Sequence, residues 1–400
     1  MTLSGDRQDP AAGERPAGQP PPPGSPYRVI ELTSVPGWIV FDLPGADRSA
    51  GGTRLARGVS IPEVALLARA MTYKFAALGD KLGGAKAGIA ADPADRAARA
   101  GLMARYCAEI GPLSSRGEFL TGPDMGTFEE DFAPLRATNA APSAISAVID
   151  GMPFEDVLTG FGVAVAAEAA LLADGAGGAS SGRASSGGAG SGRAAWAGRS
   201  VAIEGFGKVG GGVALEVVRR GGRVAAVSTI AGCVADLAGL DVPRLLALRR
   251  QHGDDCVRQY GGLTGPPERL LTVPADVLVP GTRPGLIGAA AATALPAEVR
   301  VIAPAANAPY TERGTSVLRQ RGILALPDFV CNAGAVIAYR SAREATTGQV
   351  LADVERRIAA LITEALGHPQ GPYAGACAGA AAFLRSWWGE PPAPPFAPQA

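Results

Sequence analysis

The turn from Gly205 to Gly210 constrains the fold of this chain more than any other stretch. It reads Gly-Phe-Gly-Lys-Val-Gly, a G-x-G-x-x-G pattern, and it stands between an apolar run, Val201–Ile203, and a helical stretch, Val213–Arg220. A second β-branched and apolar run, Arg223–Ser228, follows, so the unit is β-α-β. This is the context that a dinucleotide-binding turn requires, although a structural turn remains the alternative in a chain with 55 glycines.

Each glycine of the turn has a distinct expected role. Gly205 allows the sharp bend, Gly207 lets the backbone approach a pyrophosphate, and Gly210 lets the helix pack closely on the strand. The helix N-terminus then offers free N–H groups to the phosphates. The predicted cofactor-binding residues of the turn are Gly205, Phe206, Gly207, Lys208, Val209 and Gly210.

The end of the second strand lacks the acidic residue that would hold the ribose 2′-hydroxyl of NAD. Ser228 and Thr229 occupy that place and are predicted to face the cofactor. Without a carboxylate there, NAD is not specifically demanded and NADP is not specifically excluded. The predicted cofactor is therefore NAD or NADP.

Alternation of strand and helix through residues 200–340 predicts a doubly wound parallel sheet, with further strands at Val277–Val279, Val301–Ile302 and Ile323–Ala325. A chain of 400 residues is long enough for two or three domains, and we predict an α/β protein with two. The expected division is a disordered tail (1–26), a first domain (27–150), a Rossmann domain (151–345) with a Gly/Ser-rich insertion (174–195), C-terminal helices (346–389) and a loose Pro-rich tail (390–400).

Composition excludes several classes of function. The formal net charge is zero, which gives no electrostatic case for nucleic acid or an anionic membrane. No membrane span is predicted, and residues 1–26 have no apolar stretch typical of a secretory signal. The five cysteines have no metal-like spacing, so we expect reduced thiols in the cytoplasm and no metal. With only two histidines, a Ser-His-Asp triad is not expected.

Lysine is rare in this chain. Only Lys74, Lys81, Lys86 and Lys208 occur among 37 basic residues. The lysine ammonium can lose its proton when buried, whereas the guanidinium of arginine cannot, so retained lysines favour a role in proton transfer. The alternative is that these lysines cluster by chance on a solvent-exposed face of the protein.

The first three lysines fall within thirteen residues of one another, and a candidate acid follows later in the chain. A helix is expected from Ser60, with Glu63 completing a capping box, and Lys74 near its C-terminal end. Lys86 is expected in a glycine-rich loop close to a ligand. Asp124 lies between Pro123 and Gly126, where an aspartate taken alone is more often a turn former than a catalyst.

Together these motifs resemble the glutamate/leucine/phenylalanine/valine dehydrogenases over residues 28–170 and 197–370. This resemblance implies oxidative deamination of an amino acid to the 2-oxo acid and ammonia, and the reverse, with NAD or NADP. The matching pieces, in the order of the family, are Gly51–Arg54, Met71–Lys74, Leu82–Lys86, Thr121–Thr127, Gly205–Gly210, Ala306–Asn307 and Pro327–Gly334.

The resemblance also implies roles for individual residues. Lys74 would pair with the substrate α-carboxylate, Lys86 would activate the water that attacks the imine, and Asp124 would exchange the proton of the amino group. The other residues assigned to the substrate are Ala50, Gly51, Gly52, Gly122 and Asn332. Asn307 and Thr159 are assigned to the cofactor.

One departure from the glutamate-specific members bears on the substrate. Those members carry a lysine immediately before the Gly51–Gly52 pair, and here that place is Ala50. With Gly122 also expected beside the side-chain pocket, an apolar aliphatic amino acid is favoured over glutamate. Glutamate remains the alternative if Arg48 supplies the missing charge.

The resemblance implies a homo-oligomer formed through the first domain, which would also bind the substrate. The expected partners are a small amino acid or 2-oxo acid and ammonia, without nucleic acid or membrane. A non-catalytic paralogue that senses a nucleotide or an amino acid is the rival hypothesis from another class. A structural protein with an incidental glycine turn is the remaining one.

Overall fold

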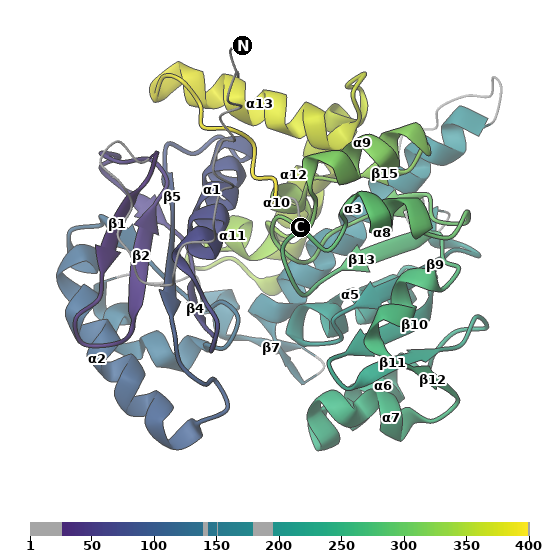
Figure 1. The fold of residues 1–400 in the computed structure, drawn as a ribbon, viewed down its shortest axis with the longest axis horizontal. Helices are drawn as coiled ribbons and strands as arrows, with labels where there is room; N and C mark the ends of the chain where they lie inside the picture. Colours follow the sequence, from purple (N-terminus) through teal and green to yellow (C-terminus); the bar gives the residue numbers. More distant parts are fainter. Residues whose placement is uncertain (1–25, 139–142, 150, 179–194, 399–400) are drawn as a thin grey trace, which may run out of the picture.

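The computed structural model describes residues 26–138, 143–149, 151–178 and 195–398. Two α/β domains lie side by side, and helices from the C-terminal part of the chain lie across the top of both (Figure 1). The expected two-domain α/β architecture is therefore confirmed.

The first domain is built on a six-stranded sheet with the order β1-β2-β5-β3-β6, and β4 also pairs with β5. Strand β5 is thus the centre of the domain, and helix α1 packs along it. The elements are β1 (Arg28–Glu31), β2 (Gly37–Phe41), β3 (Ser49–Ala50), β4 (Thr53–Leu55), α1 (Ile61–Ala77), β5 (Gly83–Ile89), α2 (Arg96–Ser115), β6 (Phe119–Leu120) and the 3₁₀ segments Glu129–Thr138 and Ser143–Ser146.

Lys86 does not lie in a loop, as the glycines around it suggested, but in the buried central strand β5. The glycines serve packing against α1. A Cβ on Gly84 would lie 2.0 Å from the Ala68 carbonyl oxygen, and one on Gly88 would lie 2.6 Å from a methyl group of Val64. Helix and strand therefore approach closely only because these positions have no side chain.

Helix α1 begins after Ser60 as expected, but the expected capping box is absent. The Ser60 side chain makes no capping hydrogen bond. Glu63 pairs instead with Arg54 of β4. A buried guanidinium is a stronger partner for the carboxylate than a backbone N–H at the helix end, because both groups carry a charge.

The second domain contains a seven-stranded sheet with the order β12-β11-β10-β9-β13-β14-β15. Strands β10, β9, β13, β14 and β15 are neighbours in this order and run parallel to one another, which confirms the doubly wound sheet. The elements are the hairpin β7 (Val148–Ile149) and β8 (Met152–Pro153), then α3 (Phe154–Gly178), β9 (Ser200–Glu204), α5 (Lys208–Arg219), β10 (Arg223–Thr229), β11 (Gly232–Ala235), α6 (Val242–His252), α7 (Cys256–Tyr260), β12 (Leu263–Gly265), β13 (Val277–Pro280), α8 (Ala289–Ala294), β14 (Val301–Ile302), α9 (Glu312–Gln320), β15 (Leu324–Ala325), α10 (Asp328–Cys331) and α11 (Gly334–Ala338).

Helix α3 is long and apolar enough to cross a membrane by length and composition, yet 72% of that stretch is buried inside the protein. It packs against α5, α11 and the C-terminal helix α12 (Thr347–Leu366). Gly160 of α3 meets Gly212 of α5, since a Cβ on Gly160 would lie 2.5 Å from the Gly212 carbonyl carbon. These features are those of a core helix.

The chain returns to the first domain at its C-terminal end. Helix α13 (Pro372–Trp387) packs on α1. The tail after Glu390, expected to be loose, contacts both domains within its described part. Arg69 and Tyr73 of α1 donate to the carbonyls of Ala393 (2.8 Å) and Pro392 (2.7 Å), and Ala397 N–H donates to the Tyr310 carbonyl (2.9 Å).

The Gly/Ser-rich insertion begins later than Asp174, because α3 continues to Gly178. Asp174 also forms an ion pair with Arg300, at 3.0 Å. Residues 179–194 of the insertion and 1–25 of the N-terminal tail lie outside the described residues.

The contact between α3 and α5 generates a stability prediction. We expect Gly160→Ala to lower the free energy of unfolding by about 1–3 kcal/mol, because the added methyl forces the two helices apart. Gly175→Ala in the same helix is the matched control, since nothing lies within 4 Å of its added Cβ. It should be neutral or stabilise by up to about 1 kcal/mol. Urea unfolding measures both, and equal effects would contradict the close contact.

Candidate active site

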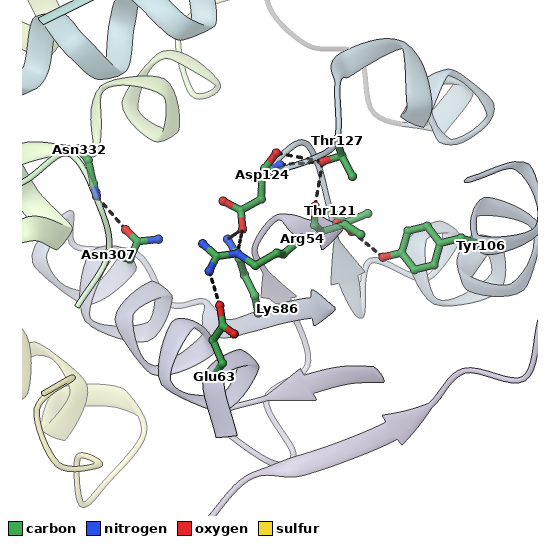
Figure 2. A network of polar contacts seen from close by, with 10 residues as sticks. Arg54, Glu63, Lys86, Tyr106, Thr121, Asp124, Thr127, Asn307 and Asn332 are labelled. Atoms are coloured by element: carbon green, nitrogen blue, oxygen red, sulfur yellow. Dashed lines mark hydrogen bonds and ion pairs between the residues drawn. The ribbon is translucent and has the colours of Figure 1, made fainter. Parts of the chain in front are cut away.

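Three charged side chains of the first domain meet at one point (Figure 2). Lys86 Nζ from β5 lies 3.2 Å from Asp124 Oδ2, and Arg54 Nε from β4 donates to the same oxygen at 3.0 Å. Arg54 also binds Glu63. Lys86 and Arg54 are 3% and 6% exposed, so these charges interact with little screening by water.

Burial and the neighbouring charges determine the pKa values of Asp124 and Lys86. Burial by itself would raise the pKa of Asp124, but the charges of Lys86 and Arg54 outweigh it and hold the pKa well below its usual range. Burial lowers the pKa of Lys86, Arg54 lowers it further, and Asp124 opposes the change. The site therefore holds an ionised carboxylate next to a lysine that releases its proton more readily than a solvated one.

A hydroxyl network fixes the segment that carries Asp124. Thr127 Oγ1 accepts the Asp124 N–H (2.9 Å) and donates to the Thr53 carbonyl (2.8 Å). Thr53 Oγ1 lies 2.8 Å from the Thr121 hydroxyl and 2.6 Å from the Tyr106 hydroxyl. Asp124 is thus held by backbone as well as by ion pairs, and its carboxylate has a defined orientation.

Lys74 supplies a second buried cation from α1. Its Nζ donates to the Asn332 carbonyl of the second domain at 3.4 Å. Burial and the charge of Lys86 lower its pKa to about 8, against the opposing charges of Asp328 and Asp124. The structure thus brings Lys74, Lys86 and Asp124 together with Asn332, although they come from distant parts of the sequence.

The second domain presents buried polar atoms to this group. Asn332 Nδ2 donates to Asn307 Oδ1 (2.8 Å) and to the Ala305 carbonyl (3.1 Å), while its Oδ1 is buried and has no partner in the described part of the chain. Asp328 accepts the Ala308 N–H at 2.8 Å, and burial raises its pKa to about 6. A buried oxygen without a partner is costly, and a donor on a bound ligand would satisfy it.

The Gly51–Gly52 pair permits the site to form. A Cβ on Gly51 would lie 1.7 Å from the Ala85 carbonyl oxygen, and one on Gly52 would lie 2.6 Å from the Pro123 carbonyl oxygen and 3.3 Å from Lys86 Nζ. Gly122 differs, because nothing lies within 4 Å of its added Cβ. Ala50, which precedes the pair, is half-buried.

The turn after β9 has the geometry of a phosphate-binding loop. Gly205 has φ of +90°, which provides the sharp bend. A Cβ on Gly210 would lie 2.1 Å from the Gly205 carbonyl oxygen, whereas one on Gly207 would meet nothing within 4 Å. No side chain caps the N-terminus of α5, so its first N–H groups can receive an anion. These features fit the pyrophosphate of a dinucleotide.

The end of β10 carries no carboxylate. Ser228 and Thr229 are buried, and the Thr229 hydroxyl donates to the Asp254 carbonyl at 2.6 Å. Glu204, at the end of β9, has its carboxylate occupied by the N–H groups of Gly281 (2.9 Å) and Thr282 (3.0 Å). Thr159, which is also predicted to bind the cofactor, lies on α3, where Gly334 packs against its backbone.

Arg54 and Asp328 are important parts of the site that the sequence analysis did not single out. Each lies inside a recognised motif, Gly51–Arg54 and Pro327–Gly334. Their roles depend on contacts with Asp124 and Lys74, which are far away in the sequence. Among the described residues, no group of three or more His, Cys, Asp or Glu side chains is placed to hold a metal.

Two family descriptions match this chain. Residues 151–355 match the Glutamate/Leucine/Phenylalanine/Valine dehydrogenase family, and residues 34–140 match the Glu/Leu/Phe/Val dehydrogenase dimerisation domain. The two matches correspond to the two domains of the structure.

Curated relatives include two glutamate dehydrogenases. The enzyme of Thermotoga maritima is 30% identical over 299 residues, which cover 72% of this chain and 67% of that protein. The mitochondrial enzyme of Dictyostelium discoideum is 31% identical over 307 residues, which cover 72% of this chain and 58% of that protein.

Solved structures of the same fold include the hetero-hexameric glutamate dehydrogenase of Thermus thermophilus in a leucine-bound form. It has a TM-score of 0.70 and 25% identity, and the match covers 87% of this chain and 83% of that one. The L-tryptophan dehydrogenase of Nostoc punctiforme has a TM-score of 0.57 at 20% identity, which shows the fold alone; the match covers 90% and 97%.

The pKa of Lys74 generates a prediction on stability. Since this pKa is about 8 in the folded protein and 10.5 for an unperturbed lysine, the unfolded chain holds more protons between these values. The free energy of unfolding of the parent should therefore rise relative to Lys74→Met as the pH increases above about 8, by at most about 1.4 kcal/mol per pH unit. Urea unfolding at pH 7–10 measures this difference. For Lys81→Met, which removes an exposed lysine, the difference in the free energy of unfolding from the parent should not change with pH. If the difference for Lys74→Met were also independent of pH, the lowered pKa of Lys74 would be contradicted.

Proposed function

The chain belongs to the glutamate/leucine/phenylalanine/valine dehydrogenase family, whose members are NAD(P)-dependent amino-acid dehydrogenases, and we propose that it deaminates an apolar aliphatic L-amino acid. The products are the 2-oxo acid and ammonia, and the reaction also runs in reverse. The buried group of Lys74, Lys86 and Asp124 at the junction of the two domains carries this proposal. A sensor could bind an amino acid through Lys74 and Asp124, but it would have no need of Lys86, a lysine whose pKa is lowered by burial.

Lys74 and Asp124 recognise the two charged groups of the amino acid. The Lys74 ammonium is buried, and among the described residues its one hydrogen bond is to a carbonyl oxygen at 3.4 Å, so the α-carboxylate of a substrate offers it a stronger, charged partner. Asp124 is ionised, so its carboxylate offers the substrate ammonium group a charged partner, and the resemblance to the family assigns to it the exchange of a proton with the amino group.

Lys86 activates water. Its lowered pKa allows the neutral amine to accept a proton from the water that attacks the imine carbon. The nicotinamide of the cofactor, when bound, supplies the hydride acceptor. Asn307 and Asn332 orient the ligands from the second domain, with Asn332 Oδ1 available to a donor.

The substrate class follows from the positions beside the catalytic group. Ala50 carries no charge, and open space adjoins Gly122. An aliphatic side chain in this space leaves no buried charge unpaired, whereas the side chain of glutamate would bury a carboxylate without a partner, at a large cost.

Glutamate is the second candidate substrate, because both curated relatives described above are glutamate dehydrogenases. This candidate needs a cation in the side-chain pocket. Arg48 is the residue to supply it, but it is exposed and its Nε lies 3.7 Å from the place of a Cβ on Gly117. That position favours a solvated role for Arg48.

For the cofactor, we propose that the chain accepts both NAD and NADP. The buried Ser228 and Thr229 bring no negative charge that would repel a 2′-phosphate, and Glu204 is engaged with backbone N–H groups. The helix N-terminus at the glycine turn binds the pyrophosphate, which both cofactors share.

We further propose a homo-oligomer assembled through the first domain, supported by the match of residues 34–140 to a dimerisation domain. All five cysteines are free and buried, which suits a reducing compartment such as the cytoplasm.

Removal of the Lys86 amine should abolish most of the activity. We expect Lys86→Ala to lower kcat by about 10²- to 10⁴-fold while the affinity for the dinucleotide changes less than about twofold, because the lysine acts as a general acid–base group. Lys81→Ala is the control and should retain the parent kcat. Steady-state kinetics and dinucleotide fluorescence measure the two quantities. A variant with kcat near that of the parent would exclude this role for Lys86.

A panel of amino acids, assayed with NAD and with NADP, tests the substrate class. We expect kcat/KM for the better of valine and leucine to exceed that for glutamate by about 1,000-fold or more, because the glutamate side chain would bury an unpaired carboxylate. Aliphatic substrates that differ by one methylene should differ less, by about 10- to 200-fold. Ala50→Lys should shift the preference toward glutamate. A parent enzyme that prefers glutamate, and loses this preference in Arg48→Ala, would establish the second candidate instead.

A further inference from the structure

Lys208 is a lysine that the proposed chemistry does not use. It is the first residue of α5, within the glycine turn, and it is exposed. Among the described residues, no carboxylate lies within ion-pair distance of it, although its charge acts on Asp156 of α3 and opposes the effect of burial on the pKa of that carboxyl group. A cation at a helix N-terminus is disfavoured by the helix dipole, so a lysine at this position needs compensating contacts elsewhere.

The Lys208 side chain reaches the first domain. Its Nζ lies 3.9 Å from the centre of the Phe128 ring and donates to the Thr127 carbonyl at 3.5 Å. Thr127 and Phe128 follow the segment that carries Asp124. The residue therefore connects the cofactor turn of one domain to the catalytic segment of the other.

Phe128 is held in place from its own domain. Its N–H donates to Asp131 Oδ2 at 2.7 Å, and the Arg99 guanidinium carbon lies 4.3 Å from the ring centre. Arg99 is fixed in turn by Asp131, at 3.0 Å. The ring thus carries two cations, Arg99 and Lys208. A dianionic pyrophosphate next to Lys208 would relieve their mutual repulsion.

The residue that Lys208 contacts, Thr127, is hydrogen-bonded to Asp124. The Thr127 carbonyl accepts the hydrogen bond from Lys208, while the Thr127 hydroxyl binds the Asp124 N–H and the Thr53 carbonyl. A shift of Lys208 toward or away from Thr127 therefore acts on the segment whose carboxylate faces Lys86.

We propose that Lys208 is a positioning residue that couples the two ligands of the enzyme. Its ammonium binds the dinucleotide phosphates at the turn and, at the same time, the Thr127–Phe128 edge of the first domain. Bound dinucleotide thereby holds the Asp124 segment against the second domain and tightens binding of the amino acid. This inference rests on the proposed function, and the coupling is reciprocal, so the amino acid tightens binding of the dinucleotide by the same factor.

The experiment measures that factor in the oligomer formed by the full chain. The reduced dinucleotide that the parent uses, NADH or NADPH, is titrated by its fluorescence with and without a saturating amino acid that the parent turns over. No reaction occurs, because both ligands are already reduced. The ratio of the two dissociation constants is the coupling factor, which we expect to fall by about fivefold or more in Lys208→Met and in Phe128→Leu.

Four variants separate coupling from a general loss of binding. Lys208→Met should also weaken binding of the dinucleotide alone, by about tenfold, which is 1.4 kcal/mol. Phe128→Leu should leave binding of the dinucleotide alone unchanged, because Phe128 belongs to the first domain. Lys208→Arg, which keeps the charge and can also stack on the ring, should restore most of both quantities. Lys81→Met removes an exposed lysine elsewhere and should match the parent.

Two outcomes overturn the inference. A coupling factor in Lys208→Met and Phe128→Leu equal to that of the parent would make Lys208 no more than a phosphate ligand or a surface residue. A parent protein that binds no dinucleotide would overturn the proposed function as well, whereas turnover with unchanged coupling would overturn this inference alone. Thermal melting of each variant identifies any general loss of fold.

Discussion

The carboxylate of Asp124, bound by both Lys86 and Arg54, is the interaction on which the first domain depends. Two cations and one anion, nearly removed from water, would be strongly destabilising without close pairing. Glu63 completes the balance by binding the other side of Arg54. Strands β4 and β5, the start of α1 and the segment after β6 must all be in register for these four charges to meet. The same arrangement produces an ionised acid beside an easily deprotonated lysine.

Close backbone approach is the second constraint, and the glycines make it possible. Gly84 and Gly88 let α1 rest on β5, while Gly51 lets the chain pass the Ala85 carbonyl. Gly160 and Gly212 do the same for α3 and α5 in the second domain. These glycines lie on or pack against the strand of Lys86 and the helix after the glycine turn, so tight packing and the geometry of the candidate site depend on the same residues.

Contacts across the domain boundary lie around the candidate site. Lys74 binds the Asn332 carbonyl, Lys208 reaches Phe128, and Arg69 and Tyr73 of α1 hold the C-terminal tail that also pairs with Tyr310. Single hydrogen bonds and exposed cation–π contacts are each worth only about 1 kcal/mol. Contacts this weak can be replaced by contacts with ligands. This property suits the proposed function, in which an amino acid and a dinucleotide bind between the two domains.

The sequence by itself determined the β-α-β unit at Gly205–Gly210, the doubly wound sheet and the family, because these depend on local patterns of apolar residues and glycines. It also marked Lys74, Lys86 and Asp124, since lysine is scarce and the motifs keep a fixed order. Only the tertiary structure decided that Lys86 lies in a central strand, that Glu63 binds Arg54 rather than capping α1, and that Arg54 and Asp328 belong to the site. Burial and ion pairing between residues far apart in sequence control these features, and a local pattern contains no information about either.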